Sequence, residues 1–279
     1  MKQLSLAEIK ARELNMLLAL QQICNAHHLK LYLCGGTLLG AIRHQGFIPW
    51  DDDIDVCLPR RDFDRLREFA QELPSNYKLL CFEDKTLIRP FIKIVDLDTQ
   101  IVNSEEFVVD QNAPSVWIDI LPVDALPSDD AEVKKIYKKA LSLRRTLYRS
   151  RSIPGKGKTK LRAIAKILPV YYAKKRGADH WVKRINELAK KTRWETADYV
   201  GIITIGIYGV KEKMPKDGFE ACCNVTFEGH SFQAMSCWNN YLTNLYGNYM
   251  ELPPESERHT HSISAYVSDD NSTINETNP

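Results

Sequence analysis

A double glycine followed by an acidic run constrains the fold of this chain more than any other feature. A buried-looking strand ends at Gly35-Gly36, and four of the five residues from 51 to 55 are aspartates. Because side chains alternate along a strand, Asp53 and Asp55 are expected on the same face. Two carboxylates that close repel each other unless a cation lies between them. Clustered carboxylate oxygens suit Mg²⁺ or Mn²⁺, so the run predicts a metal site.

A solvated turn is the alternative interpretation of this acidic run, and it is the commoner one for such runs. Here, however, the aspartates are bracketed by side chains that would not be left in water: Ile48, Trp50, Ile54, Val56 and Leu58. We therefore favour the metal site, with Asp53 and Asp55 as ligands and with Asp51 and Asp52 in the loop beside them.

A third carboxylate, Asp119, is flanked by apolar residues on both sides in a strand-like run. Burying a carboxylate without a partner costs roughly 2 kcal/mol or more, so Asp119 needs one. Joining Asp53 and Asp55 as a third metal ligand would meet that need. Asp124, which lies between two prolines, is interpreted as a turn or cap residue.

The segment after the double glycine reads as a short helix over residues 38–43, with Thr37 as its cap. The free N–H groups at such a helix start can bind an anion. Lys93 lies in another apolar alternation, so it faces either a site or a solvent edge.

Hydrophobic periodicity predicts the remaining elements. Helices are expected at residues 5–28, 60–73, 129–150, 179–192 and 237–247. Strands are expected at residues 77–82, 89–95 and 199–208, with a hairpin at 224–234. From residue 266 on, Asp, Asn, Ser and Thr dominate, so a loose tail is expected.

The composition is that of a soluble globular protein, with 44% hydrophobic and 27% charged residues in a length of 279 that allows one large domain or two. Neither a signal peptide nor a transmembrane helix is expected, because no apolar stretch is long enough. The seven cysteines include no C-x-x-C pair. We expect buried thiols in a reducing compartment, and neither a disulfide framework nor a zinc cage.

Charge is distributed unevenly, although the net charge is only +2. Residues 144–193, the basic block, hold 17 Lys and Arg against two acidic residues, so this block carries +15 and the rest of the chain −13. The block is either the solvated face of a helical hairpin or a surface that docks on an anionic membrane or a polyanionic substrate. Aromatic and aliphatic residues beside the cations favour the membrane. No nucleic-acid partner is expected.

The run from Gly35 to Asp55, G-G-T-L-L-G-A-I-R-H-Q-G-F-I-P-W-D-D-D-I-D, resembles the LicD family of phosphocholine transferases, whose relatives include the fukutin-related sugar-phosphate transferases. Three later motifs match in order: W-I-D-I-L-P-V-D from Trp117, F-E-G-H from Phe227 and Y-G-N-Y-M-E-L-P-P from Tyr246. The family is similar to the nucleotidyltransferase superfamily, in which a glycine turn precedes a D-x-D strand and a later strand supplies a third carboxylate.

The resemblance implies an α+β fold, with a nucleotidyltransferase-like mixed sheet flanked by helices and a basic helical insertion. It divides the chain into a catalytic core (1–128), the insertion (129–195), a part that completes the catalytic domain (196–265) and the loose tail (266–279).

The activity that the resemblance implies is transfer of phosphocholine from CDP-choline to a sugar hydroxyl, with release of CMP. The implied acceptor is a lipid-linked glycan precursor of teichoic-acid type. The chain would act as a cytoplasmic, peripheral protein at the inner face of the cell membrane, with the basic block on the anionic surface. The implied catalytic residues and Mg²⁺ ligands, with Mn²⁺ as an alternative, are Asp53, Asp55 and Asp119. Asp119 is also a candidate for accepting the hydroxyl proton.

Aromatic walls suit the choline cation, and basic side chains suit the diphosphate. The candidate substrate-binding residues are Gly35, Gly36, Thr37, Arg43, His44, Trp50, Lys93, Trp117, Tyr249, Arg258 and His259. Phe47 and Trp238 are further aromatic candidates.

Two other functions stay open. One is a nucleotidyltransferase that moves NMP from an NTP to a sugar or another small acceptor. The other is a non-catalytic protein that binds membranes or polyanions through the basic block. The sequence has no P-loop, G-x-S-x-G, H-E-x-x-H or Rossmann glycine motif, which disfavours ordinary kinases, serine hydrolases, zinc proteases and dehydrogenases.

Overall fold

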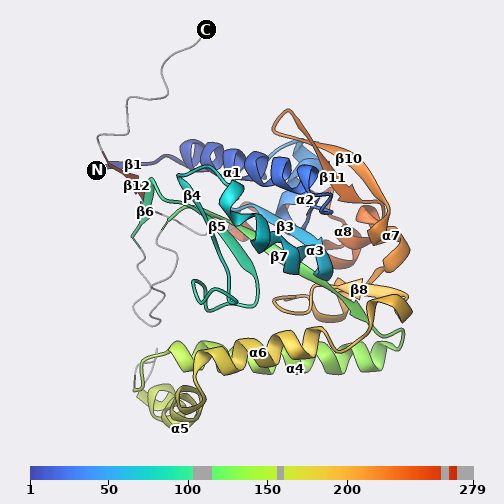
Figure 1. The fold of residues 1–279 in the computed structure, drawn as a ribbon. Coiled ribbons are helices and arrows are strands. Elements are labelled where there is room, and N and C mark those ends of the chain that lie inside the picture. The colour runs from blue at the N-terminus through green and yellow to red at the C-terminus, as the bar shows by residue number, and fades with distance from the viewer. Residues whose placement is uncertain (103–114, 156–159, 259–263, 269–279) are drawn as a thin grey trace.

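A mixed sheet with helices on both sides forms the centre of the molecule, as the computed structural model in Figure 1 shows, and this confirms the expected α+β class. The structure describes residues 1–102, 115–155, 160–258 and 264–268. The main strands of the sheet lie in the order β2 (Tyr32–Leu33), β3 (Asp55–Pro59), β7 (Trp117–Leu126), β5 (Ile92–Asp96) and β4 (Tyr77–Leu80).

Strand β7 is the spine of this sheet. It runs parallel to β3 and antiparallel to β5, so both neighbours meet its first half. Its last three residues pair with β8 (Tyr199–Gly201), which in turn pairs with β9 (Met214–Pro215). Any side chain near the start of β7 is therefore held from two sides.

Helix α1 (Leu6–Ala26) crosses one side of the sheet. A capping box fixes its start: the Ser5 hydroxyl accepts from the Glu8 N–H, and the Glu8 carboxylate accepts from the Ser5 N–H at 2.7 Å. Apolar side chains at helical spacing cover the sheet: Ile9, Met16, Leu17 and Leu20. The helix expected at residues 5–28 is confirmed.

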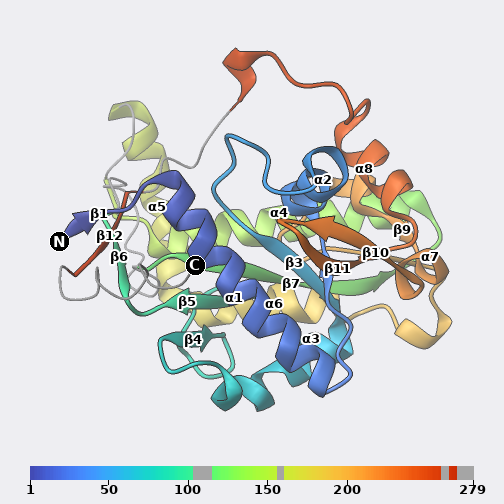
Figure 2. The ribbon, with the colours of Figure 1, turned by 90° about the horizontal axis from the view of Figure 1, so that it is seen from above.

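A helical hairpin covers the other side. It consists of α4 (Asp130–Arg151), which Asp129 caps, and α6 (Ala178–Ala189), and both were expected from periodicity. Helix α5 (Lys160–Arg176) connects them and lies at their outer end in both views (Figure 1 and Figure 2). None of the described helices is long and apolar enough to cross a bilayer.

Smaller elements complete the fold. A hairpin of β10 (Cys222–Phe227) and β11 (His230–Met235) packs against α2 and β2. A second small sheet joins β1 (Lys2–Gln3), β12 (Ala265–Val267) and β6 (Thr99–Ile101). The short helices and 3₁₀ turns are α3 (Arg60–Leu66), η1 (Arg67–Glu72), η2 (Trp194–Thr196), η3 (Gly209–Glu212), α7 (Lys216–Glu220), α8 (Trp238–Tyr246) and η4 (Glu255–Glu257).

The strand expected at residues 199–208 is wrong beyond its first three residues. After β8 the chain leaves the sheet and runs as a loop to η3. A side chain at Gly206 would collide with the carbonyl oxygen of Ile202, so the backbone folds back on itself more tightly than other residues allow. Apolar composition alone cannot distinguish such a compact loop from an extended strand.

Two further expectations need correction. The tail expected from residue 266 begins later, because Tyr266 and Val267 belong to β12; residues from 269 on lie outside the described part. Asp124 is neither a turn nor a cap residue. It lies inside β7, is 2% exposed, and accepts two hydrogen bonds of 2.7 Å from the Arg60 guanidinium. The seven cysteines are free thiols, and four of them are buried: Cys24, Cys34, Cys57 and Cys81.

Candidate active site

The centre of the candidate site is the edge where β3 and β7 run side by side. Asp55, the first residue of β3, pairs in register with Asp119 of β7, and Lys93 of β5 pairs with Asp119 from the other side. The Lys93 ammonium lies 2.9 Å from Asp119 Oδ1. That buried oxygen has no hydrogen bond of good geometry among the described residues. The contact is therefore an ion pair, and Asp119 retains the capacity to bind a further cation.

Two glycines bring the start of α2 (Gly35–His44) against the aspartates. Gly35 has a φ of +53°, and a Cβ there would lie 3.2 Å from Asp55 Oδ2. A Cβ at Gly36 would lie 2.8 Å from Asp51 Oδ2, closer than atoms normally approach. Any larger residue at these positions would push the carboxylates away.

Thr37 is not the helix cap, because α2 starts three residues earlier than this requires and Cys34 is its N-cap. The Thr37 hydroxyl instead accepts a hydrogen bond of 2.8 Å from the Asp55 N–H, which fixes the first residue of β3. Asp53 precedes β3, so the expectation that Asp53 and Asp55 share one strand face is wrong.

The carboxylates of the acidic loop, β3 and β7 nevertheless lie close enough to shift one another's pKa values. Burial and the charges of Asp53, Asp119 and Asp51 raise the pKa of Asp55 well above its usual range, and Lys93 opposes this effect. Burial and the charges of Asp53, Asp52 and Asp51 likewise raise the pKa of Glu13, which α1 buries to 1% exposure. The cluster therefore carries more negative charge than its own lysines balance.

This excess fits a hard divalent cation, because carboxylate oxygens are its preferred ligands and a cation would relieve the repulsion. Asp119 Oδ1, which has an ion pair with Lys93 but no hydrogen bond of good geometry among the described residues, agrees with that fit. In the described ranges, however, no three Asp, Glu, His or Cys side chains converge as a ready-made metal-ligand set. The assignment of Asp53, Asp55 and Asp119 as ligands thus stays a prediction.

The loop between α2 and β3, residues 45–54, is held by two distant side chains. The Lys10 ammonium donates to the carbonyl oxygens of Ile48 and Pro49, each at 3.1 Å. Glu228 Oε1 accepts from the Phe47 N–H at 2.9 Å. Glu228 and Gly229 form the two-residue turn of the β10–β11 hairpin, both with positive φ. The F-E-G-H motif is therefore a turn that anchors the acidic loop.

A second group of predicted site residues gathers where α2 ends. The Arg43 guanidinium donates to the carbonyl oxygens of Tyr249 (2.8 Å) and Glu251 (3.2 Å) and so ties the chain after α8 to α2. Burial, with a smaller effect of the Arg43 charge, lowers the pKa of His44. Arg258 covers the ring of Trp50, and His259 lies outside the described residues.

Three of the proposed aromatic walls already face a cation of the protein itself. The Lys93 ammonium is 3.8 Å from the ring centroid of Trp117, and the Arg258 guanidinium is 4.7 Å from that of Trp50. The ring of Phe47 lies 5.1 Å from the Lys10 ammonium. At least one face of each of these rings therefore already contacts a cation of the protein and is not open to choline.

Glu13, Lys10 and Glu228 were not expected in the site. Glu13 did carry a signal, because it lies four residues after Ile9 and four before Leu17, on the apolar face of α1. A carboxylate on a buried apolar face is costly unless a partner or a proton compensates its charge, so its presence indicates a specific role. Glu228 carried a signal only as part of the F-E-G-H motif, which did not reveal its role, and Lys10 carried none, since each acts on backbone groups that only the fold brings near.

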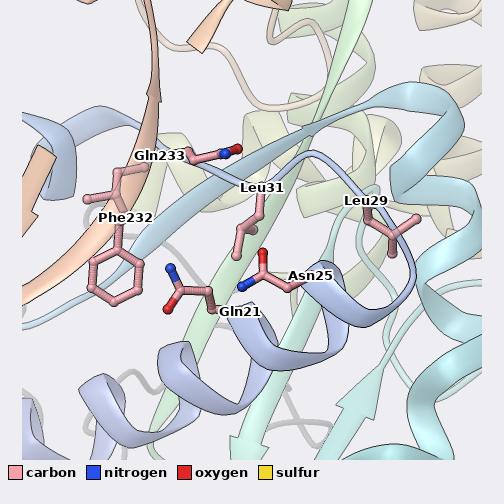
Figure 3. A pocket seen from close by; sticks show the side chains of 7 residues that line it. Gln21, Asn25, Leu29, Leu31, Phe232 and Gln233 are labelled. Carbon is pink, nitrogen blue, oxygen red and sulfur yellow. The ribbon is translucent and has the colours of Figure 1, made fainter. Parts of the chain in front are cut away.

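A separate hollow lies between α1, β2 and β11, and no carboxylate of the described residues lines it (Figure 3). Its volume of about 20 Å³ admits little more than one water molecule. Polar and apolar side chains line it: Gln21, Asn25, Leu29, Leu31, Leu33, Phe232 and Gln233. It is too small for a nucleotide or a sugar.

Comparison with known proteins agrees with this geometry. The family model described as "LicD/FKTN/FKRP, nucleotidyltransferase domain" matches residues 28–140, which include the double glycine, the acidic loop, Lys93 and Asp119. The lipopolysaccharide cholinephosphotransferase LicD of Haemophilus influenzae is 33% identical over 275 residues, covering 96% of this chain and 100% of that protein. An uncharacterized protein of Rickettsia typhi is 39% identical over 62 residues, 22% of this chain and 20% of its own length. Because the likeness to the Haemophilus protein spans nearly all of this chain and the whole of that protein, the chain belongs to the LicD family.

Proposed function

We propose that this protein transfers phosphocholine from CDP-choline to a hydroxyl of a glycan. One observation carries the proposal: Asp55, Asp119 and Lys93 meet beside the double glycine in a chain that aligns over 96% of its length with a lipopolysaccharide cholinephosphotransferase. Phosphoryl transfer needs positioning and charge neutralisation more than covalent catalysis, and a cluster of carboxylates with one buried lysine suits that need.

The reaction has a simple balance of bonds. The acceptor hydroxyl oxygen forms a bond to the phosphorus that carries choline, and the bond from that phosphorus to the bridging oxygen breaks. CMP leaves with the electron pair, and the hydroxyl proton passes to a base. A carboxylate of the cluster would take that proton, and the ion pair of Asp119 with Lys93 supports Asp119 as the candidate.

Asp53, Asp55 and Asp119 would hold Mg²⁺ in this proposal, with Mn²⁺ as an alternative. The ion supplies Lewis-acid stabilisation of charge on the attacking and leaving oxygens. Thr37 and Gly35 keep Asp55 in place, through the hydrogen bond to its N–H and through the close approach to its carboxylate. Lys93 offsets part of the negative charge while the donor is absent.

The acceptor in this proposal is a lipid-linked glycan precursor of teichoic-acid type, reached at the cytoplasmic membrane face. Helix α5 supports a membrane contact, because it exposes an apolar stripe at helical spacing beside Lys174, Lys175 and Arg176. The stripe consists of Ile164, Ile167, Leu168, Tyr171 and Tyr172, which are 43–78% exposed. A solvated hairpin would have no reason to leave these side chains in water.

The activity test measures CMP release from CDP-choline with Mg²⁺ and a glycolipid acceptor, beside a parallel reaction with each NTP. We expect product from CDP-choline only, and a fall to about one hundredth or less in Asp55→Asn and Asp119→Asn. Asp217→Asn, an exposed aspartate of α7, is the matched control. Product from an NTP would favour the nucleotidyltransferase, and full turnover in the Asn variants would refute the carboxylate mechanism.

The membrane test measures binding to vesicles of phosphatidylcholine with and without phosphatidylglycerol. We expect binding only to the anionic vesicles, weakened by salt and by Leu168→Asp. Leu97→Asp, which changes an equally apolar and 52% exposed residue far from α5 in sequence, should bind as the wild type does. Equal binding of both variants would show that the stripe does not dock.

A further inference from the structure

We propose, on the basis of the phosphocholine transfer above, that Tyr208 and Tyr246 form the binding site for the quaternary ammonium of the donor. Their rings lie 5.5 Å apart between centroids at an interplanar angle of 78°, so one presents its face where the other presents its edge. Neither residue belongs to the aromatic candidates that the sequence suggested.

The pair lies at a junction of two elements that approach the carboxylates. Tyr208 ends the loop after β8, immediately before η3, and Tyr246 is the last residue of α8. Helix α8 is tied to the double glycine, because the Tyr241 hydroxyl accepts from the Gly35 N–H at 3.3 Å. Gly35 in turn lies so close to Asp55 that a Cβ on it would be 3.2 Å from Asp55 Oδ2. Burial raises the pKa of both phenols, and a smaller effect of the Asp55 charge acts in the same direction on each.

The two rings differ in exposure. Tyr208 is 36% exposed and the adjacent Ile207 is 78% exposed, whereas Tyr246 is only partly exposed and packs against the core. The cation–ring contacts among the described residues include Trp50, Trp117 and Phe47, but neither of these two tyrosines. Three of the aromatic candidates from the sequence thus already contact a cation of the protein, whereas this pair does not within the described part of the chain.

The loop that carries Tyr208 is rigidly held from behind. The buried carboxylate of Glu212 accepts from the Tyr208 N–H at 3.3 Å, and Arg144 of α4 donates to the Gly206 carbonyl oxygen at 2.8 Å. A fixed ring loses little freedom when a ligand binds, which favours a preorganised site.

The chemistry selects a particular ligand class. A quaternary ammonium has no N–H to donate, so it gains from ring faces and from diffuse negative charge more than from hydrogen-bond acceptors. The pair supplies the rings, and the nearby aspartates supply the charge. A primary ammonium, by contrast, would lose hydrogen bonds to water in the same place.

Equilibrium binding of CDP-choline, CDP-ethanolamine and CDP to the purified full chain with Mg²⁺ tests this inference. Wild type should bind CDP-choline more tightly than the other two. Tyr208→Leu and Tyr246→Leu should each weaken CDP-choline binding by about 5- to 30-fold and leave CDP binding unchanged. Tyr208→Phe and Tyr246→Phe, which keep the ring, should retain the preference for choline.

The outcomes separate the two proposals. If wild type binds CDP-choline no better than CDP, the phosphocholine function itself fails. If wild type prefers choline and the Leu variants keep that preference, the function stands and the tyrosine pair is refuted. Tyr208 is the more exposed of the two, so its replacement disturbs the fold less and decides the matter even if Tyr246→Leu does not fold.

Discussion

Glu212 gives the fold a pH dependence that one substitution should remove. Its side chain is 4% exposed, and burial raises its pKa from the usual 4.5 to about 7, against the opposing effects of the Tyr208 N–H and of Arg144. A carboxyl whose pKa is raised on folding stabilises the fold fully below its unfolded pKa. That stability is lost as pH rises through the folded value, here between about 4.5 and 7.

The magnitude follows from the size of the shift. A shift from 4.5 to about 7 corresponds to about 3 kcal/mol between the protonated and ionised states. Glu212→Gln keeps an oxygen that can accept from the Tyr208 N–H, and it cannot ionise. The variant should therefore match wild type near pH 4.5 and be more stable by up to about 3 kcal/mol at pH 8.

Urea unfolding of both proteins at several pH values between 4.5 and 8 measures this difference. Taking the difference between variant and wild type cancels the titration of all other groups. Glu187→Gln, at a glutamate of α6 that is 67% exposed, is the control and should show no pH-dependent difference. The reasoning is refuted if Glu212→Gln is no more stable than wild type at pH 8.

Three further substitutions test other parts of the structure. Asp55→Asn should raise the Tm without metal, because it relieves carboxylate repulsion, and should abolish the Tm increase that Mg²⁺ gives wild type; an unchanged Mg²⁺ response would exclude Asp55 as a ligand. Arg60→Met should cost roughly 3–5 kcal/mol in urea unfolding by leaving Asp124 buried without its partner, and adding Asp124→Leu should recover much of that loss. Glu228→Ala should lower both the Tm and the rate of CMP release by freeing the acidic loop at Phe47, whereas an unaltered rate would mean that the clamp is not needed.

The sequence was most informative at residues whose chemistry leaves few alternatives, such as paired glycines and clustered or apolar-flanked aspartates. The double glycine, the aspartates at 53 and 55 and the flanked Asp119 pointed to one site, and the fold brings them to one end of β3 and β7. Periodicity found α1, α4 and α6, because each buries one apolar face along several turns.

The sequence could not predict features that depend on contacts between residues far apart in the chain. Lys93 was an open case until the pairing of β5 with β7 put it against Asp119. Asp124 looked like a turn residue beside prolines, and only the approach of Arg60 from α3 makes its burial possible. Tyr208 was hidden in an apolar run whose departure from the sheet depends on close packing at Gly206.

The small sheet of β1, β12 and β6 has a consequence for how the protein is made. Lys2 pairs with Val267, so a strand near the start of the chain must wait for one near the other end of the described residues. Contacts so distant in sequence form late, because a long loop has to close before they contribute. During synthesis on the ribosome, β1 should thus stay unpaired with β12 while the large sheet of β2, β3, β7, β5 and β4 forms. The small sheet should be completed only after β12 has been synthesised.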